Sequence, residues 1–192
     1  MLSTRRALVL ASASPRRREL LERVGVAIEV VATSVDESVQ EGEAADQYLD
    51  RVVLAKFESA RARVGVDRVV LVADTSVLRD ATILGKPENH AHALEMLATL
   101  SGRRHVVATR FGLGRGDVFE AATVETVVEF RSLSRHEMTT YVATGEGKDK
   151  AGGYGIQGRA AAFVRRIEGS YTNVVGLPLA EVIEALERFD FG

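Results

Sequence analysis

The chain contains no cysteine, and no long apolar run occurs within its 192 residues. The absence of cysteine excludes disulfides, thiolate metal sites and a cysteine nucleophile, and it is typical of proteins in a reducing compartment. No segment is long and apolar enough to span a bilayer, and no apolar stretch near the amino end leads to a cleavage site. We therefore expect a cytoplasmic protein that makes no contact with membranes.

The chain also lacks a strong net charge, because 25 lysines and arginines stand against 27 acidic residues and leave a formal charge of −2. No overall basic field attracts a nucleic-acid backbone, so we expect no stable nucleic-acid binding and only local roles for the arginines. With 46% hydrophobic residues, the chain can bury a substantial core. We expect a single domain over residues 1–192, built as one body or as two closely packed lobes.

Common catalytic signatures are missing as well. The sequence has no GxxxxGK[ST] P-loop, no GxGxxG dinucleotide motif and no HExxH zinc motif. Its four histidines show no spacing typical of a metal site, and its serines lack both a GxSxG elbow and an evident histidine base. Acyl transfer is therefore not expected, and the chemistry must come from other groups.

Strand and helix patterns alternate in the first half of the chain, and hairpin-like strands follow in the second half. This order predicts an α/β fold with a mixed sheet flanked by helices. Strands are expected at residues 8–11, 28–32, 68–73, 77–84 (a short hairpin), 104–113, 118–130 and 160–167. Helices are expected at residues 15–24, 44–64, 90–100, 135–145 and 179–189. The strand at 68–73 is expected to end at Asp74.

The stretch SASPRRR places three arginines in the first turn of a helix. Ser14 is a good N-cap, Pro15 suits the first helical position, and Gly25 suits the stop. A helix amino end already carries partial positive charge, so Arg16, Arg17 and Arg18 repel it and one another. They either extend into water and pair with nearby glutamates, or form a phosphate cradle with backbone N–H groups and serine hydroxyls.

Two charged residues accompany apolar segments. Lys56 lies on or beside the core-facing stripe of the long helix, so it either extends to water or reaches a cleft and contacts phosphate. Asp74 directly follows the apolar strand RVVLVA. It lies either where ligands bind in open α/β sheets, or in a turn that it caps together with Thr75 and Ser76.

Polar loops offer further candidates, each with an ordinary alternative. Asp36 and Glu37 are solvated acids, or oxygen ligands for Mg²⁺ beside Asp74. Lys86 is a solvated loop lysine, or a residue that the predicted hairpin brings to the same side of the sheet as Asp74.

The stretch GEGKDKAGGYGIQG contains six glycines around an apolar centre. This pattern favours an ordered loop whose backbone approaches a ligand closely. Gln157 within it either satisfies local backbone groups or binds the edge of a nucleobase. Basic groups in several segments, together with carboxylates at a strand end, suit hydrolysis of a phosphate ester or anhydride with a divalent metal.

Several blocks of the sequence resemble the Maf family of nucleoside triphosphate pyrophosphatases: LASASPRRRELL, VDES, VADTSV, ILGKP, LSGRRH, GKDKAGGYGIQG and GSYTNVVGLPL. They run from about Leu8 to Leu186 in the family's order. The SPRR and DKAGGYGIQG forms resemble the subfamily that acts on dTTP and UTP. The resemblance implies a mixed sheet with two lobes around a deep cleft, similar to the inosine triphosphate pyrophosphatases (a Maf/Ham-like fold).

The resemblance also implies a reaction and a set of site residues. A nucleoside triphosphate would be hydrolysed at its α-phosphate to the monophosphate and pyrophosphate, with a divalent cation, Mg²⁺ or Mn²⁺, as cofactor. Asp74 would be the catalytic proton acceptor and, with Glu37, a metal ligand. The positions that match substrate-specificity residues are Arg16, Thr75 and Gln157, and those that match phosphate-binding residues are Ser12, Arg17, Lys56 and Lys86.

Some questions stay open at this point. A nucleotide-binding regulator of septum formation and cell division, with little turnover, is the alternative to an enzyme, and modified nucleotides are alternative substrates. The sequence also leaves open whether the chain forms a homodimer. Phe57, Ser76 and Arg110 depart from the family's usual residues, and of these only Arg110 has no explanation in the sequence.

Overall fold

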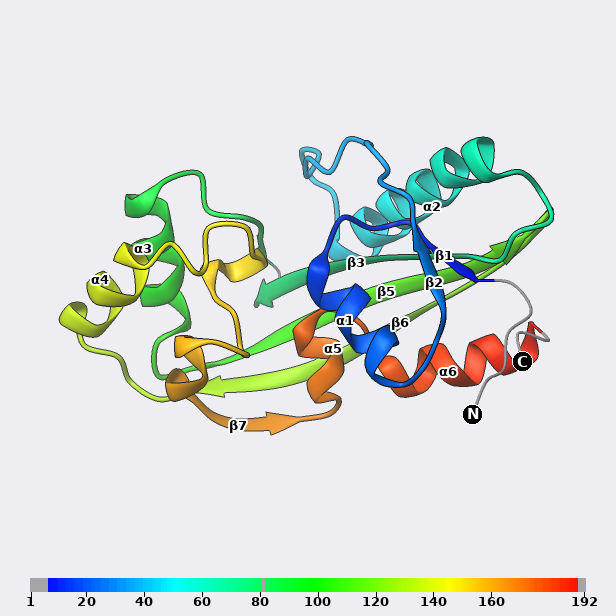
Figure 1. The fold of residues 1–192 in the computed structure, drawn as a ribbon. Coiled ribbons are helices and arrows are strands. Elements are labelled where there is room, and N and C mark those ends of the chain that lie inside the picture. The colour runs from blue at the N-terminus through cyan, green and yellow to red at the C-terminus, as the bar shows by residue number, and fades with distance from the viewer. Residues whose placement is uncertain (1–6, 81, 190–192) are drawn as a thin grey trace. The chain divides into compact units, whose positions relative to one another are not determined.

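The computed structural model describes residues 7–80 and 82–189 and has an α/β fold built on a seven-stranded sheet (Figure 1). The strands are β1 (Leu8–Leu10), β2 (Ile28–Val30), β3 (Val70–Arg79), β4 (Thr82–Leu84), β5 (Arg104–Arg115), β6 (Val118–Phe130) and β7 (Val164–Glu168). The helices are α1 (Pro15–Arg23), α2 (Ala45–Val64), α3 (His90–Leu100), α4 (Arg135–Ala143), α5 (Tyr171–Val175) and α6 (Leu179–Arg188). Two short 3-10 helices are η1 (Ala151–Gly153) and η2 (Arg159–Phe163).

The sheet is mixed, as the sequence predicted. Its strand order is β2-β1-β3-β5-β6-β7, with β4 paired to β3 outside this path. Strand β1 runs parallel to β2 and to β3, whereas β4 is antiparallel to β3 and β7 is antiparallel to β6. Strands β5 and β6 are joined by a two-residue turn at Gly116 and Asp117, a connection that fits neighbouring antiparallel strands.

The chain divides into two compact units. Unit 1 comprises residues 1–74, 109–124 and 176–192, and unit 2 comprises residues 75–108 and 125–175. Each of the strands β3, β5 and β6 contributes residues to both units. A single domain over residues 1–192 stays a prediction, and residues 1–6, 81 and 190–192 lie outside the described part of the chain.

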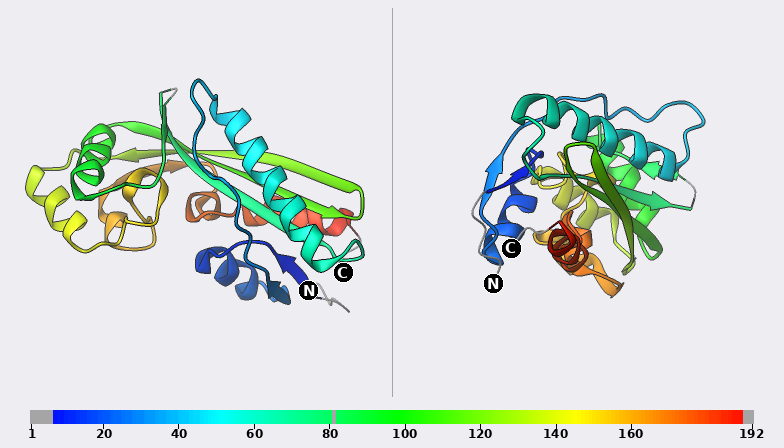
Figure 2. Two further views of the ribbon diagram at one scale, coloured as in Figure 1. Left: turned by 90° about the horizontal axis from the view of Figure 1, so that it is seen from above. Right: turned by 90° about the vertical axis from the view of Figure 1, so that its right-hand side faces the viewer.

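In unit 1, helices cover both faces of the strands. Figure 2 shows α2 on one face and α6 on the other. Beneath α2, Val53 and Phe57 pack with alternate residues of the buried strands, among them Val9 and Val70. Because side chains alternate along a strand, the intervening residues, such as Leu71, belong to the opposite face. Both sides of these central strands are therefore buried, which explains their continuous apolar sequences.

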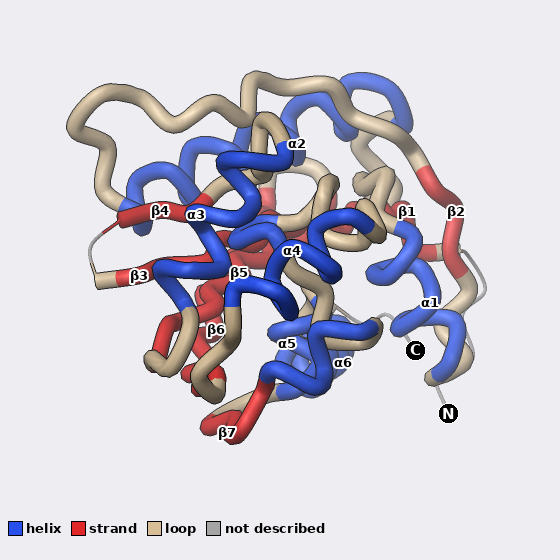
Figure 3. Tube along the Cα trace, turned by 90° about the vertical axis from the view of Figure 1, so that its left-hand side faces the viewer, coloured by secondary structure: helices blue, strands red, loops and turns tan. Residues whose placement is uncertain are grey.

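Unit 2 contains α3 and α4 in contact (Figure 3), and η1 packs against α3. Its core includes an aromatic cluster in which Phe130 meets the rings of His105, Tyr154 and Phe163 edge to face, at centroid distances of 5.0, 4.8 and 6.0 Å. Such tilted arrangements are the favoured geometry of aromatic pairs. The loop that contains Tyr154 is therefore anchored in the core, as the apolar centre of the glycine-rich stretch predicted.

Most predicted helix boundaries are confirmed. Ser14 is the N-cap of α1 with Pro15 at its first position, and Gly25 follows the end of the helix with φ of +79°. Asn89 caps α3, where its side chain accepts a hydrogen bond from the backbone N–H of His92. Ser134 forms the predicted capping box at the start of α4.

Two expectations about secondary structure are wrong, and one short helix was missed. Strand β3 does not end at Asp74 but continues through it to Arg79, because Asp74 and Ser76 are both buried and belong to the strand. Residues 160–163 form part of a 3-10 helix instead of a strand. The short helix α5 (Tyr171–Val175) was not predicted.

The structure accounts for two of the unusual residues. Phe57 is buried with its ring centroid 4.5 Å from that of Phe119, and Gly114 leaves the space for it, since a Cβ there would lie 2.3 Å from the Phe57 ring. The guanidinium of Arg110 forms a 2.5 Å ion pair with Asp50 of α2. Arg110 therefore links β5 to the long helix within unit 1.

Candidate active site

A buried lysine between two carboxylates forms the centre of the candidate site. The Nζ atom of Lys56 lies 2.7 Å from Oδ1 of Asp74 and 2.7 Å from Oε1 of Glu37. The exposed fractions of the three side chains are 7% for Lys56, 11% for Asp74 and 38% for Glu37. The predicted core-facing position of Lys56 is confirmed, and the ammonium group binds acids instead of extending to water.

The sheet explains how Asp74 meets Lys56. Asp74 lies on the same face of β3 as Val70 and Val72, both of which pack beneath α2. The last residue of β1, Leu10, is paired with Leu71, so Asp74 lies beyond the carboxyl end of β1. The prediction that Asp74 ends its own strand is therefore wrong, and Asp74 lies instead beyond the end of the neighbouring strand β1.

Arg17 turns into unit 1 instead of into water. Its guanidinium donates hydrogen bonds to the carbonyl oxygens of Gly176 (2.7 Å) and Ala73 (2.9 Å) and to the Ser12 hydroxyl (3.1 Å). Burial lowers the pKa of Arg17, while the nearby carboxylate of Asp74 opposes this effect. Carbonyl oxygens thus compensate the charge of this arginine at the helix start.

The other two arginines of the first turn differ from Arg17. Arg18 is exposed and pairs with Glu22 at 2.8 Å, so the simpler alternative is correct for this residue. Arg16 is half-buried and belongs to unit 1. The phosphate cradle at this helix start stays a prediction.

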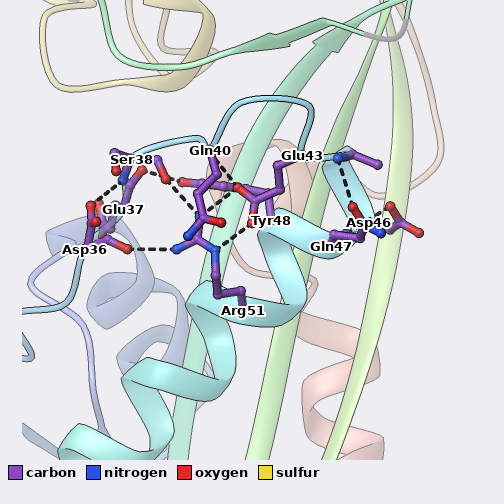
Figure 4. Close-up of polar contacts among 10 residues, drawn as sticks. Asp36, Glu37, Ser38, Gln40, Glu43, Asp46, Gln47, Tyr48 and Arg51 are labelled. Carbon is purple, nitrogen blue, oxygen red and sulfur yellow. Dashed lines mark hydrogen bonds and ion pairs between the residues drawn. The ribbon is translucent and has the colours of Figure 1, made fainter.

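Tyr48 and Arg51 of α2 hold the loop that contains Glu37, a role that the sequence analysis missed (Figure 4). The Tyr48 hydroxyl donates to the carbonyl oxygen of Glu37 at 3.2 Å. Burial, followed by the charges of Asp74 and Glu37, raises the pKa of Tyr48. These contacts could not be recognised beforehand, because a polar loop with acidic residues looks solvated in the sequence.

Asp36, the acid that precedes Glu37 in this loop, makes a different contact. Its Oδ1 atom accepts a hydrogen bond from the backbone N–H of Ser38 at 2.9 Å. Hydrogen bonds with the side chain of Ser38 and then with its backbone lower the pKa of Asp36. The side chain is exposed. Asp36 therefore stabilises a turn, whereas the carboxylate of Glu37 forms the ion pair with Lys56.

The remaining predicted site residues, Thr75, Lys86 and Gln157, belong to unit 2. Lys86 and Gln157 are exposed. The structure thus brings together Ser12 with Arg17, and Lys56 with Glu37 and Asp74, within unit 1. The parts assigned to Thr75, Lys86 and Gln157 in substrate binding stay predictions.

The glycine-rich loop of unit 2 has a buried anchor, Tyr154, three residues before Gln157. Nε2 of His105 lies 2.8 Å from the Tyr154 hydroxyl, while Nδ1 of His105 is buried without a hydrogen-bond partner among the described residues. Burial, with a contribution from Arg79, lowers the pKa of His105 to about 4. Gly152 and Gly153 adopt φ of +68° and +71°, which allows the loop to turn just before Tyr154.

Glu37 and Asp74 are the residues best placed to hold a divalent cation. Both carboxylates reach one ammonium nitrogen, so their oxygens converge on a single position for positive charge. Within residues 7–80 and 82–189, no group of three or more histidine, cysteine or acidic side chains could enclose a metal ion. Two carboxylates fit Mg²⁺, which usually completes its shell with waters and substrate phosphates.

Comparison with known proteins identifies the family. The family model described as "Maf-like protein" matches residues 7–189. The chain belongs to this family. A Maf-like relative from Acinetobacter baylyi, named dTTP/UTP pyrophosphatase, is 46% identical over 179 residues, which cover 93% of this chain and 97% of the relative. Another from Anaeromyxobacter, with the same name, is 52% identical over 186 residues, covering 94% of this chain and 88% of the relative.

The fold of this Maf-like chain also matches a solved structure. The Ham1 protein of Staphylococcus aureus shares a TM-score of 0.52 at 12% sequence identity, with 96% of this chain and 100% of that chain covered. This likeness confirms the predicted Ham-like fold. In the described residues, the structure contains no helix with the length and apolar character needed to cross a membrane.

Proposed function

We propose that the chain is an enzyme that hydrolyses dTTP and UTP to the nucleoside monophosphates and pyrophosphate. The observation that carries this proposal is the placement of Lys56 between Asp74 and Glu37, both at 2.7 Å, in a chain of the Maf-like family. The names of relatives that match over 93–94% of this chain support the choice of substrates. Nothing comparable favours a nucleotide-binding regulator without turnover.

In the proposed reaction, water attacks the α-phosphorus. The new bond joins the water oxygen to this phosphorus, the bond to the bridging oxygen of the β-phosphate breaks, and pyrophosphate leaves with the electron pair. Asp74 accepts the proton of the attacking water through its carboxylate. Lys56 places a positive charge beside Asp74, where it stabilises negative charge on the phosphoryl oxygens and holds the base in position.

A divalent cation fits this arrangement. Glu37 and Asp74 would hold Mg²⁺ or Mn²⁺, and the ion would neutralise phosphate oxygens and make a bound water more acidic. Two carboxylates surround the single ammonium group of Lys56, and a divalent cation beside them would offset the negative charge that Glu37 and Asp74 present to the substrate phosphates. We therefore expect turnover to depend on the metal and to stop when a chelator removes it.

Substrate choice is proposed to depend on Arg16, Thr75 and Gln157. A pyrimidine is small, and a loop with Gln157 could close over it while excluding a purine. Distinguishing thymine from uracil is harder, because one methyl group contributes only ~1 kcal/mol. Activity on both dTTP and UTP follows from this limit. Replacing Gln157 with alanine should loosen the preference among bases, and an unchanged substrate profile would argue against its role.

The test compares the wild-type protein with Asp74→Asn and with Asp117→Asn, a matched control. The Asp117 side chain is 94% exposed and pairs with Arg61 in unit 1. Each protein is incubated with a panel of nucleoside triphosphates and Mg²⁺ or Mn²⁺, and monophosphate, diphosphate and pyrophosphate are resolved. We expect pyrimidine monophosphate and pyrophosphate from the wild type and the control, and none from Asp74→Asn. Nucleotide binding without turnover in the wild type would overturn the proposal in favour of the regulator.

A cytoplasmic location is part of this proposal, because the chain has no cysteine and its proposed substrates are cytoplasmic metabolites.

A further inference from the structure

The guanidinium of Arg51 makes several contacts between α2 and the loop that joins β2 to α2. Arg51 of α2 forms a two-pronged ion pair with Glu43, with Nε at 2.6 Å from Oε1 and Nη2 at 2.7 Å from Oε2. The same group donates to the carbonyl oxygens of Asp36 (3.3 Å) and Ser38 (2.8 Å). Arg51 therefore binds the loop on both sides of Glu37 (Figure 4).

Glu43 extends the hold of Arg51 further along the loop. While one carboxylate oxygen pairs with Nε of Arg51, the other accepts both from Arg51 and from the backbone N–H of Gln40 at 3.0 Å. The side chain of Glu43 is only 8% exposed. The pKa of Glu43 is lowered, chiefly by its hydrogen bonds with Arg51. A paired carboxylate of this kind favours one geometry, because both partners are planar and share two parallel bonds.

Tyr48 completes the set of contacts. The guanidinium carbon of Arg51 lies 5.6 Å from the centre of the Tyr48 ring, and the Tyr48 hydroxyl binds the carbonyl oxygen of Glu37. Positions 48 and 51 lie three residues apart on α2 and are therefore neighbours on its surface. Three consecutive carbonyl groups, those of residues 36, 37 and 38, are thus bound by two side chains of one helical turn.

This arrangement has a consequence for Glu37. Its side chain is 38% exposed and reaches Lys56 from a loop without regular structure. A loop acid of this kind stays near a buried lysine only if its backbone is fixed, because ordering free residues costs ~1–2 kcal/mol each. The contacts of Arg51 supply that fixation from the same helix that carries Lys56.

We propose that Arg51 is a positioning residue: it fixes the loop of residues 36–43 on α2 so that the Glu37 carboxylate meets Lys56 opposite Asp74. The inference rests on the proposed function for its effect on turnover, although the fixation of the loop does not. Arg51 does not touch the reacting atoms in this scheme. Its replacement acts through Glu37.

The first experiment measures the loop without any reaction. Amide hydrogen exchange is followed by NMR for Gln40, whose N–H is bonded to Glu43, in the wild type, in Arg51→Lys and in Arg61→Lys. Lysine keeps the charge but cannot form the two-pronged pair. Arg61 is a matched control on α2 that pairs with exposed Asp117. We expect faster exchange in Arg51→Lys alone. Unchanged exchange would overturn the inference, whether or not the protein turns over nucleotides.

The second experiment tests the route through Glu37. Turnover of dTTP is measured against Mg²⁺ concentration for the wild type, Arg51→Lys, Glu37→Gln and the double variant. Loss of a residue that orients a metal ligand typically costs about 10- to 100-fold in metal affinity or activity. We expect such a loss, with a higher half-saturating Mg²⁺ concentration, when Arg51 is replaced in the wild type. In the Glu37→Gln background, we expect Arg51→Lys to cause little further loss of turnover.

The outcomes separate the two proposals. Equal fold losses from Arg51→Lys in both backgrounds would show that Arg51 does not act through Glu37 and would overturn the inference. A merely structural role would lower the unfolding midpoint without raising the Mg²⁺ requirement, and that result would also overturn it. If the wild type releases no pyrophosphate, the proposed function fails, and the exchange of the Gln40 amide still decides the fixation of the loop.

Discussion

The buried histidine of unit 2 should make the stability of the protein depend on pH. His105 is 3% exposed, is bonded only at Nε2 among the described residues, and lies edge to face against Phe130. A proton on this ring would put a charge and an unpaired N–H in an apolar core. For this reason burial lowers the pKa of His105 from its ordinary value of 6.5 to about 4.

The sign and size of the effect follow from linkage. Between pH 6.5 and 4 the unfolded chain binds a proton at His105 that the folded chain does not, so stability falls as the pH falls through this window. At about 1.4 kcal/mol per pH unit, the free energy of unfolding should drop by about 3 kcal/mol from this residue. This loss of stability is absent above pH 6.5 and complete below about pH 4.

The assay is urea unfolding at several values between pH 7 and 4, with a check that the transition is two-state. The wild type is compared with His105→Gln, which cannot titrate at this position. The stability difference between the two should shrink by about 3 kcal/mol on acidification. Tyr154→Phe is the matched control, since it removes the hydroxyl partner and leaves the buried ring. A difference between the wild type and His105→Gln that stays constant from pH 7 to 4 would refute the argument from burial.

Three further predictions concern packing and charge. Gly114→Ala should lower the free energy of unfolding, measured by urea titration, by ~1–3 kcal/mol, because the Cβ of the new alanine would lie 2.3 Å from the Phe57 ring. The pKa of Glu137 is lowered from its ordinary value of 4.5 to about 2, mainly by its hydrogen bond with Arg131, so ionised Glu137 should stabilise the protein above pH 4.5. Glu137→Gln should therefore lower the free energy of unfolding at neutral pH, and this difference from the wild type should disappear as the pH falls toward 2. Arg17→Lys should lower the thermal unfolding midpoint, because a single ammonium nitrogen cannot occupy both positions from which Nε and Nη1 of Arg17 bind their acceptors.

Much of the fold follows from local signals in the sequence. Caps and glycines fixed the ends of α1, α3 and α4, because these signals act within a few residues of the helix terminus. The error at Asp74 has a different origin. The polar residues Asp74, Thr75 and Ser76 resembled a break, yet Lys56 from a distant helix compensates the buried acid and lets the strand continue.

The candidate site was predictable where periodicity or family motifs mark it. The helical stripe showed that Lys56 faces inward, but nothing local indicated that its partners would be Asp74 and Glu37. The contacts of Arg51 with the loop were not predictable for the same reason, since they join residues 8 to 15 positions apart through an irregular segment. Arg17 shows a local signal whose partners were different from those expected. Three arginines in the first turn of a helix suggested a bound anion, whereas the buried guanidinium of Arg17 donates hydrogen bonds to backbone carbonyl oxygens.

The division of the chain at β3 separates some of the proposed tasks, although Arg16, also proposed to select the substrate, belongs to unit 1. Asp74 is the last residue of its segment in unit 1, and Thr75 begins unit 2, although one peptide bond joins them. The proposed proton acceptor therefore belongs to the same unit as Lys56 and Glu37, while Thr75 and Gln157, proposed to recognise the base, belong to the other. Lys56 pairs with both Glu37 and Asp74 through side chains of unit 1, so a substitution at Gln157 replaces none of these three groups. Substitutions at Thr75 or Gln157 could thus change the substrate preference without replacing the groups proposed to perform hydrolysis.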